Sequence, residues 1–200
     1  MTPLMIQLPE RILTPRLILR SPTGADGPAV NAAVCESIDA LRFCMPWAQT
    51  EPTLAQSESD CRRMQARFLL REDLALMMFR RGADDREVGF IGGTGLHRIQ
   101  WPLRRFEIGY WCRTGESGQG YVTEAVQALA GFAFDQLEAR RVEIRIDPLN
   151  PRSCRVAERA GFTLEGVHRC DSATPDGTSR DTCVYALVRR RQADGAVAGS

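Results

Sequence analysis

The 200-residue sequence contains no lysine, and all 26 of its basic side chains are arginine. Because 25 acidic residues balance them, the formal net charge is only +1. Such a charge creates no long-range field that would attract a nucleic acid or an anionic membrane. The absence of lysine itself matches GC-rich codon usage and excludes no function. The charge balance predicts that neither nucleic acid nor a membrane is a partner.

Long apolar runs are also absent. No stretch reaches the roughly 18 to 20 uninterrupted apolar residues that a membrane-spanning helix needs. The N-terminus has no basic segment followed by an apolar core, as a secretory signal would. These two absences predict a cytoplasmic protein.

Metal-binding and disulfide patterns are missing as well. The seven cysteines form no C-x-x-C pair and are odd in number, which argues against a zinc site and against a secreted disulfide framework. The two histidines, His97 and His168, are not close in sequence to Cys112 or Cys154, as a paired cysteine nucleophile would suggest. We therefore expect reduced, mostly packed thiols and no metal.

The apolar content of 44% is sufficient for one domain with its own core, which we place at residues 1–190. Residues 191–200 are mostly small and have no periodic apolar face, so they are expected to form a flexible C-terminal tail. Periodicity in the domain predicts strands at residues 17–20, 74–80, 87–96, 105–112, 142–147, 162–167 and 182–189. It predicts helices at residues 25–38, 56–71, from about 122 to 137, and from 150 to 161.

The start and end of the last helix are marked by particular residues. Asn150 is suited to cap it, Pro151 to occupy its first turn, and Gly161 to end it. Within residues 87–96, Gly92, Gly93 and Gly95 indicate a bulge. The whole pattern predicts an α+β fold (α/β three-layer) with a mixed sheet.

The most informative stretch is a strand that enters a glycine-containing loop and then a helix. In this arrangement several unpaired backbone N–H groups point to one spot, where the helix dipole also favours negative charge. Gly118 and Gly120 in that loop therefore indicate a phosphate site. Taken alone the pair is weak evidence, and it matches neither the dinucleotide fingerprint nor the P-loop.

Several motifs together resemble the GNAT superfamily of N-acetyltransferases, and in particular its ribosomal-protein N-terminal (RimJ/RimL-type) branch. The core of the resemblance is Glu107-Ile108-Gly109-Tyr110-Trp111, then Gly118-Gln119-Gly120-Tyr121 and Thr123-Glu124-Ala125. Three more pieces follow the branch in order: Thr14-Pro15-Arg16-Leu17, Pro46-Trp47, and Asn150-x-x-Ser153 leading to Ala160-Gly161-Phe162. The likeness covers about residues 13–190.

The resemblance implies a mostly antiparallel sheet that splays open between the strands at 106–112 and 142–147. Acetyl-CoA would be the co-substrate, and its pantetheine arm would pair with backbone groups of Trp111, Cys112 and Arg113. The residues implied to hold the pyrophosphate through their amides are Ser117, Gly118, Gln119, Gly120, Tyr121 and Val122. Val122 and Ser117 depart from the residues usual in the family, but a backbone donor survives both changes.

Amine acetylation needs a group that takes a proton from the acceptor. Glu107 is the candidate base, since it lies on the strand beside the expected thioester and burial there would raise its pKa. The alternative is a carboxylate paired across strands with Arg104 or Arg105. Asp171 and His97 are held in reserve for the same role.

Ser153 matches a serine that, in the resembled branch, protonates the CoA thiolate. Its alternative is a hydroxyl in the first turn of a helix capped by Asn150, and Asn150 itself could cap the helix, hold the pantetheine arm, or do both. Phe43 and Trp47 would line the acceptor pocket or belong to the core.

The sequence thus predicts an acetyltransferase that moves an acetyl group from acetyl-CoA to a primary amine by direct attack in a ternary complex. The acceptor is left open between a protein N-terminus and a small-molecule amine. Two other functions are kept: a non-catalytic acyl-CoA-binding module, and an acetyltransferase that detoxifies an amine antibiotic or a polyamine. A monomer and a homodimer are both open.

Overall fold

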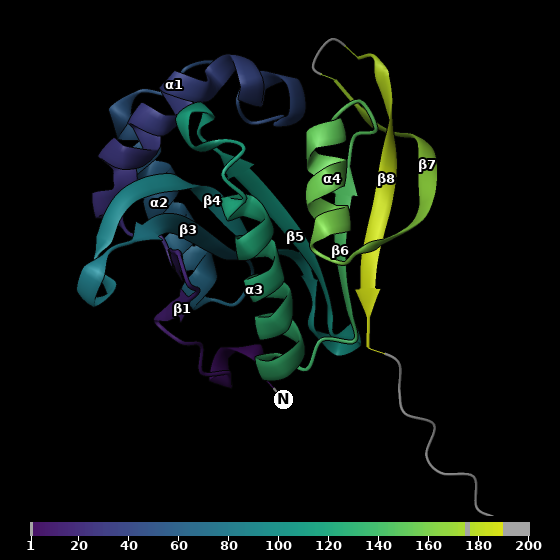
Figure 1. Ribbon diagram of the computed structural model, residues 1–200, viewed down its shortest axis with the longest axis horizontal. Helices are drawn as coiled ribbons and strands as arrows, with labels where there is room; N and C mark the ends of the chain where they lie inside the picture. Colours follow the sequence, from purple (N-terminus) through teal and green to yellow (C-terminus); the bar gives the residue numbers. More distant parts are fainter. Residues whose placement is uncertain (1, 175–176, 190–200) are drawn as a thin grey trace, which may run out of the picture.

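The computed structural model describes residues 2–174 and 177–189, which form one eight-stranded sheet in the order β1-β2-β3-β4-β5-β6-β8-β7 (Figure 1). Only β5 and β6 pair in parallel; the other neighbours are antiparallel. The strands are β1 (Arg11–Leu13), β2 (Leu17–Arg20), β3 (Leu74–Arg81), β4 (Glu87–Gln100), β5 (Arg105–Cys112), β6 (Arg141–Ile146), β7 (Thr163–Ala173) and β8 (Ser179–Val188). The predicted α+β fold with a mixed, mostly antiparallel sheet is confirmed.

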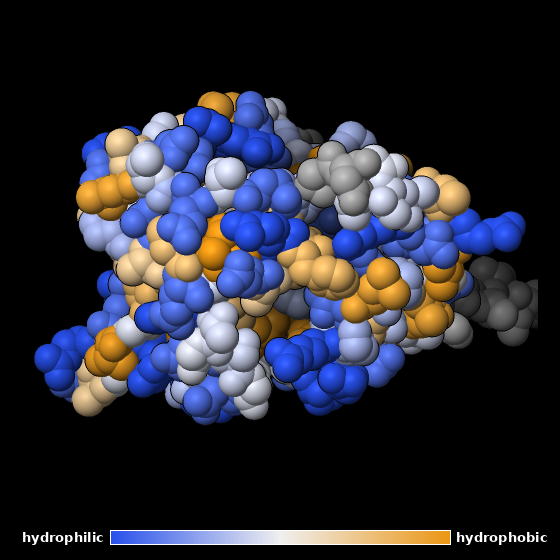
Figure 2. Space-filling model, turned by 90° about the horizontal axis from the view of Figure 1, so that it is seen from above, coloured by the Kyte–Doolittle hydropathy of each residue, from blue (hydrophilic) through white to orange (hydrophobic). Residues whose placement is uncertain are grey.

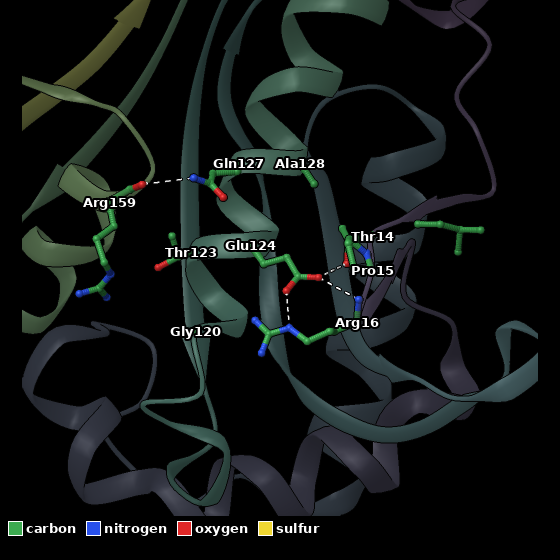
Figure 3. A pocket seen from close by; sticks show the side chains of 10 residues that line it. Thr14, Pro15, Arg16, Gly120, Thr123, Glu124, Gln127, Ala128 and Arg159 are labelled. Carbon is green, nitrogen blue, oxygen red and sulfur yellow. Dashed lines mark hydrogen bonds and ion pairs between the residues drawn. The ribbon is translucent and has the colours of Figure 1, made fainter.

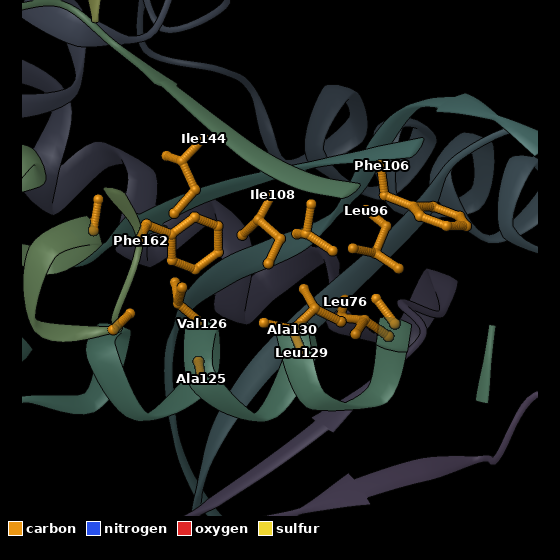
Figure 4. Packing of buried hydrophobic residues seen from close by; sticks show 14 of the residues in the cluster. Leu76, Leu96, Phe106, Ile108, Ala125, Val126, Leu129, Ala130, Ile144 and Phe162 are labelled. Carbon is orange, nitrogen blue, oxygen red and sulfur yellow. The ribbon is translucent and has the colours of Figure 1, made fainter. Parts of the chain in front are cut away.

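Four α-helices in the described residues cover the two faces of the sheet: α1 (Gly27–Cys44), α2 (Leu54–Leu69), α3 (Tyr121–Gln136) and α4 (Pro151–Arg159). The larger core cluster joins α3 and α4 to the sheet through side chains such as Leu129, Phe106 and Ile144 (Figure 4). A second cluster joins α1 and α2 to the opposite face around Ile18 and Met77. The molecule therefore has three layers, with the sheet in the middle.

None of the helices in the described part of the chain has the length and apolar character needed to cross a bilayer. The cytoplasmic location remains a prediction. The expected tail at 191–200 lies outside the described residues.

Helix ends follow the signals in the sequence. The Thr53 hydroxyl accepts from the Gln56 amide at 3.2 Å, and the Gln56 side chain accepts from the Thr53 amide at 2.7 Å, which is a reciprocal capping box at the start of α2. At α4 the Asn150 side chain accepts from the Ser153 amide at 3.1 Å. Gly161, with φ +91°, follows that helix.

The structure also adds elements that the periodicity did not predict. β1 has only three residues, and its partner β2 lies next to it only after the chain has folded back. α1 runs to Cys44 rather than to residue 38, because Leu41 is still buried against the second cluster. The predicted bulge in β4 is present: Met78 pairs with Gly92 but Phe79 pairs with Phe90, which leaves Ile91 as the extra residue.

The predicted splay is confirmed by the pairing of β5 with β6. Three pairs hold these strands together, and the last of them joins Glu107 to Glu143. Beyond that pair neither strand has a strand partner on the shared side within residues 2–174 and 177–189. This opening positions the candidate site described below.

Core packing gives a first testable prediction. Leu129 of α3 is fully buried against the sheet, so Leu129→Ala is expected to lower the free energy of unfolding by about 2–5 kcal/mol. Leu103, which is 59% exposed, provides the control, since Leu103→Ala should cost well under 1 kcal/mol. Urea unfolding of both variants measures the difference, and equal losses would contradict the assigned core.

Candidate active site

A cavity of about 620 Å³ lies where β5 and β6 separate. Its wall includes residues of α1 and α2 on one face of the sheet and reaches Asn150 and Ser153 at the start of α4. Figure 2, seen from above, shows a hollow with hydrophobic surface near the middle of the molecule, and hydrophilic side chains stand at its border. A ligand in this cavity would therefore contact groups from both faces of the sheet.

Glu107 lines the cavity, and in the described part of the chain its carboxylate has an ion pair but no hydrogen bond. Its Oε2 is buried and has no hydrogen-bond partner among the described residues. The closest cation is Arg98, whose Nη1 lies 3.5 Å away on a side chain that is 71% exposed. Burial raises the pKa of Glu107 above its ordinary value, against the opposing charge of Arg98.

The alternative pairing of Glu107 with Arg104 or Arg105 is not formed. Arg105 donates instead to Glu143 at 2.7 Å, and Arg104 lies 3.4 Å from Glu138. Among the described residues, the carboxylate of Glu107 is therefore ion-paired only with the exposed Arg98.

Ser153 meets a tyrosine that the sequence analysis had not assigned to the site. The Tyr110 hydroxyl lies 2.8 Å from Ser153 Oγ and donates to the Ser153 carbonyl at 3.1 Å. Burial raises the pKa of Tyr110 to about 12, so the phenol stays protonated at neutral pH. The one feature of the sequence that could have pointed to Tyr110 is its place in the Gly109-Tyr110-Trp111 motif.

The loop before α3 presents a row of free backbone donors. The Ser117 amide closes a turn onto the Thr114 carbonyl at 3.1 Å, so the free row begins one residue later than predicted. From residue 118 to 123 the amides have no acceptor in the part of the chain that the structure describes. Gly118 and Gly120 have φ of +80° and +82°, and a Cβ on Gly118 would meet nothing within 4 Å. This surface is open and suited to an anion.

The same loop is held in place by α1. Glu36 accepts from the Gly115 amide at 3.1 Å and from Arg113 Nε at 3.0 Å. Ser37 Oγ accepts from the Thr114 amide at 2.8 Å. Arg113 is one of the three residues expected to pair with pantetheine. Its amide already donates to the Ile91 carbonyl at 2.9 Å, so this amide is not free for a ligand.

The first turn of α3 is tied to the chain before β2. Glu124 accepts from Thr14 Oγ1 at 2.6 Å, from the Arg16 amide at 2.9 Å and from Arg16 Nε at 2.6 Å (Figure 3). Burial alone would raise the pKa of Glu124, but these donors together lower it. A second cavity, also of about 620 Å³, lies here beside Gly120, Thr123 and Arg159.

The other predicted residues are only partly gathered at the site. Trp47 lines the main cavity, and its ring packs edge-on against Trp111 at 5.9 Å. Phe43 is not in the cavity wall, and its ring lies under Arg180 at 4.7 Å.

The side chains of two more predicted residues, Val122 and Cys112, pack against the larger core cluster. Burial raises the pKa of the Cys112 thiol to about 11, so it stays a neutral side chain.

The two reserve bases are separated by the fold. Asp171 is paired with Arg145 and is not in the cavity wall, whereas His97 is part of it. Sequence periodicity could not have found the residues that α2 contributes, because the way a helix turns toward a cavity depends on its packing. These residues are Ser57, Asp60, Arg63, Met64 and Arg67. No cluster of three or more potential metal ligands occurs in the described residues, and the absence of a metal remains a prediction.

A sheet that opens beside a row of free amides at a helix start fits the class of acyl-CoA-dependent acyltransferases. The chain belongs to the GNAT acetyltransferase family, since the model of the acetyltransferase (GNAT) domain matches residues 16–163.

Individual relatives agree with this family. The ribosomal-protein-serine acetyltransferase of Escherichia coli (strain K12) is 34% identical over 134 residues, which are 66% of this chain and 71% of that protein. YdaF of Bacillus subtilis (strain 168) is 37% identical over 99 residues, 50% of this chain and 54% of that protein, so the match spans about half of its length. The solved structure of RimL, a ribosomal L7/L12 alpha-N-protein acetyltransferase in complex with coenzyme A, has a TM-score of 0.77 at 25% identity and covers 90% of this chain and 98% of that one. The predicted family, fold and enzyme class are thus confirmed.

Proposed function

We propose that this chain transfers an acetyl group from acetyl-CoA to a primary amine by direct attack within a ternary complex. The observation that carries the proposal is the cavity at the β5–β6 opening, where Glu107 Oε2 lies buried and accepts no hydrogen bond from any described residue. A buried acceptor of this kind is suited to take a proton from an amine nitrogen. Acetyl-CoA supplies an activated acetyl group as its thioester.

The diphosphate of acetyl-CoA is assigned to the free amides from Gly118 to Val122. These donors surround open space at a helix start, and the helix dipole favours negative charge there. The neighbouring cavity on the outer side of α3, with Arg16 and Arg159 at its border, has room and positive charge for the nucleotide that is attached to the diphosphate. The unpaired edges of β5 and β6 are left for the pantetheine arm.

Two polar groups have separate roles in the transfer. Glu107 takes a proton from the attacking nitrogen on the face covered by α1 and α2. Ser153, which Tyr110 and the Asn150 cap hold in place, donates its hydroxyl hydrogen to the departing sulfur. Trp47 and Trp111 form the aromatic side of the acceptor pocket.

The acceptor is assigned to the α-amino group of a peptide or protein. An α-amino group has a pKa near 8, so it needs less help than a lysine, whose pKa is about 10.4. The name of the E. coli relative, a ribosomal-protein-serine acetyltransferase, supports the same choice. The small-amine acceptor and the non-catalytic binding module are the competing functions, and the absence of nucleic-acid partners and the oligomeric state remain predictions.

Calorimetry with acetyl-CoA, followed by a thiol-release screen of peptides and small amines, tests the proposal. We expect a dissociation constant of about 1–100 μM, that is, roughly 5.5–8 kcal/mol of binding free energy, and release of CoA only when an amine is present. Binding without release by any amine would favour the non-catalytic module. No heat at millimolar acetyl-CoA would overturn acetyl transfer altogether.

A further inference from the structure

His97 and Asp73 form a hydrogen-bonded pair at the edge of the main cavity. His97 Nδ1 lies 3.0 Å from Asp73 Oδ1 and 2.9 Å from Oδ2. Because a carboxylate only accepts hydrogen bonds, Nδ1 must carry the hydrogen. The lone pair of the neutral ring is therefore on Nε2.

The imidazole ring lies close to two glycines of the sheet, Gly95 and Gly109. A Cβ on Gly109 would lie 2.9 Å from His97 Cδ2 and 3.1 Å from Nε2, and one on Gly95 would lie 2.9 Å from Cε1. Gly109 comes two residues after Glu107, which makes the last β5–β6 pair. The lone pair of Nε2 is thus placed next to the point where the strands separate.

The His97 ring is in contact with solvent and lies among charged groups. The His97 side chain is 32% exposed. The charged groups around it come from three further elements: Asp73 before β3, Arg67 of α2 with Nη2 at 3.6 Å from Asp73 Oδ2, and Glu107 of β5 with its partner Arg98. His97 is also the last regular β4–β5 pair before a register shift, a place where strands often redirect side chains at active sites.

Acetylation of an amine at neutral pH removes two protons from nitrogen. The acceptor arrives mostly as an ammonium group, and its first proton must leave before the lone pair can attack. The second leaves after the C–N bond has formed. Overall, an ammonium and acetyl-CoA give an amide, CoA as the thiol and one proton in solution.

Resting on the proposed function, we propose that His97 is a further catalytic residue that takes the first of these protons from the acceptor ammonium. The N–H bond breaks, the proton binds Nε2, and the electron pair stays on the amine nitrogen for attack on the thioester carbonyl. Asp73 is a positioning residue that holds Nδ1–H and balances the charge of the imidazolium. The ring then returns this proton to solvent. Glu107 accepts the second proton and gives it up through solvent, and Ser153, whose hydroxyl hydrogen has gone to the departing sulfur, is reprotonated in its place.

The second histidine of the chain provides a matched control. His168 is 57% exposed, its Nδ1 lies 3.6 Å from Asp171, and it is not in the cavity wall. It therefore has a carboxylate partner but no access to the proposed acceptor. Because the sequence has only these two histidines, His97→Gln and His168→Gln assign both rings in an NMR spectrum.

Long-range ¹H–¹⁵N NMR of the full chain tests the ring directly, without any activity. We expect neutral His97 in the Nδ1–H form and a change of tautomer population in Asp73→Asn, with His168 unaffected. A neutral His97 in the Nε2–H form would overturn the proposal, because that nitrogen could not accept a proton.

Kinetics with a peptide that has a free α-amino group tests the role. His97→Gln keeps a donor for Asp73 but cannot take a proton, so we expect kcat/KM to fall about 10²-fold at pH 7 and less than 10-fold at pH 9, where the amine is already free. His168→Gln should match the wild type, and acetyl-CoA binding should be unchanged in both variants. An equal loss at both pH values, or no loss, would overturn the role of His97 alone. A wild-type protein that releases no CoA with any amine would instead refute the proposed function.

Discussion

Glu107→Gln is expected to lower kcat for amine acetylation by about 10²–10⁴-fold, the usual contribution of a positioned general base. Glutamine keeps the size and polarity of the side chain but cannot accept the proton. Because burial raises the pKa of Glu107, the wild-type rate should rise with pH through that pKa, and this limb should vanish in the variant. Thiol release over pH 5–9 measures the rate of both proteins, and calorimetry shows whether acetyl-CoA still binds to the variant.

The same substitution should make the protein more stable. The folded state binds the Glu107 proton more tightly than the unfolded chain does, so wild-type stability declines as pH rises from the unfolded pKa through the raised folded pKa. Glu107→Gln lacks this decline and should melt at a higher temperature than the wild type near pH 8. A gain in stability combined with a loss of rate is expected for a catalytic group whose burial costs stability.

Glu143 is the matched control, since it pairs with Glu107 across the parallel strands. Burial acts to raise its pKa, but hydrogen bonds from Arg105 and Arg141 outweigh this and lower it. The stability that it contributes is present above the unfolded pKa and is lost as pH falls through the folded one. Glu143→Gln should therefore destabilise the protein near neutral pH. If both substitutions destabilise the protein, the conclusion that burial of the Glu107 carboxylate costs stability is wrong.

Ser153→Ala is the second substitution with a large expected effect. We expect kcat to fall about 10²-fold, because the departing sulfur loses its proton donor, while the affinity for acetyl-CoA changes less than about threefold. Tyr110→Phe, which removes the hydroxyl 2.8 Å from Ser153 Oγ, should lower kcat in the same direction but less. Single-turnover thiol release separates this step from binding.

A serine outside the cavity, Ser172 on β7, provides the comparison. Ser172→Ala is expected to behave as the wild type. If Ser153→Ala also turns over at the wild-type rate, the serine serves only as a first-turn residue of α4. If it loses acetyl-CoA binding and rate in equal measure, its role is in holding the co-substrate.

The sequence by itself determined the features that depend on neighbours along the chain. The glycines that must adopt positive φ mark the loop at Gly118 and Gly120, and the Asn150 cap and Pro151 mark the start of α4. Alternating apolar residues identified most strands, because a half-buried strand repeats every two residues. These signals predicted the α+β fold class, and the motif set that resembles the GNAT superfamily implied the opening between β5 and β6.

The tertiary structure decided which side chains meet. Sequence offered Arg104 and Arg105 as partners of Glu107, but strand register gave Arg105 to Glu143. Glu107 is left with the cation of Arg98 and no hydrogen bond among the described residues. The tertiary structure also brought Ser153 to Tyr110 and Asp73 to His97. The physical reason is that such contacts depend on register, bulges and helix packing, which are set by burial of the whole core and have no local spacing in the chain.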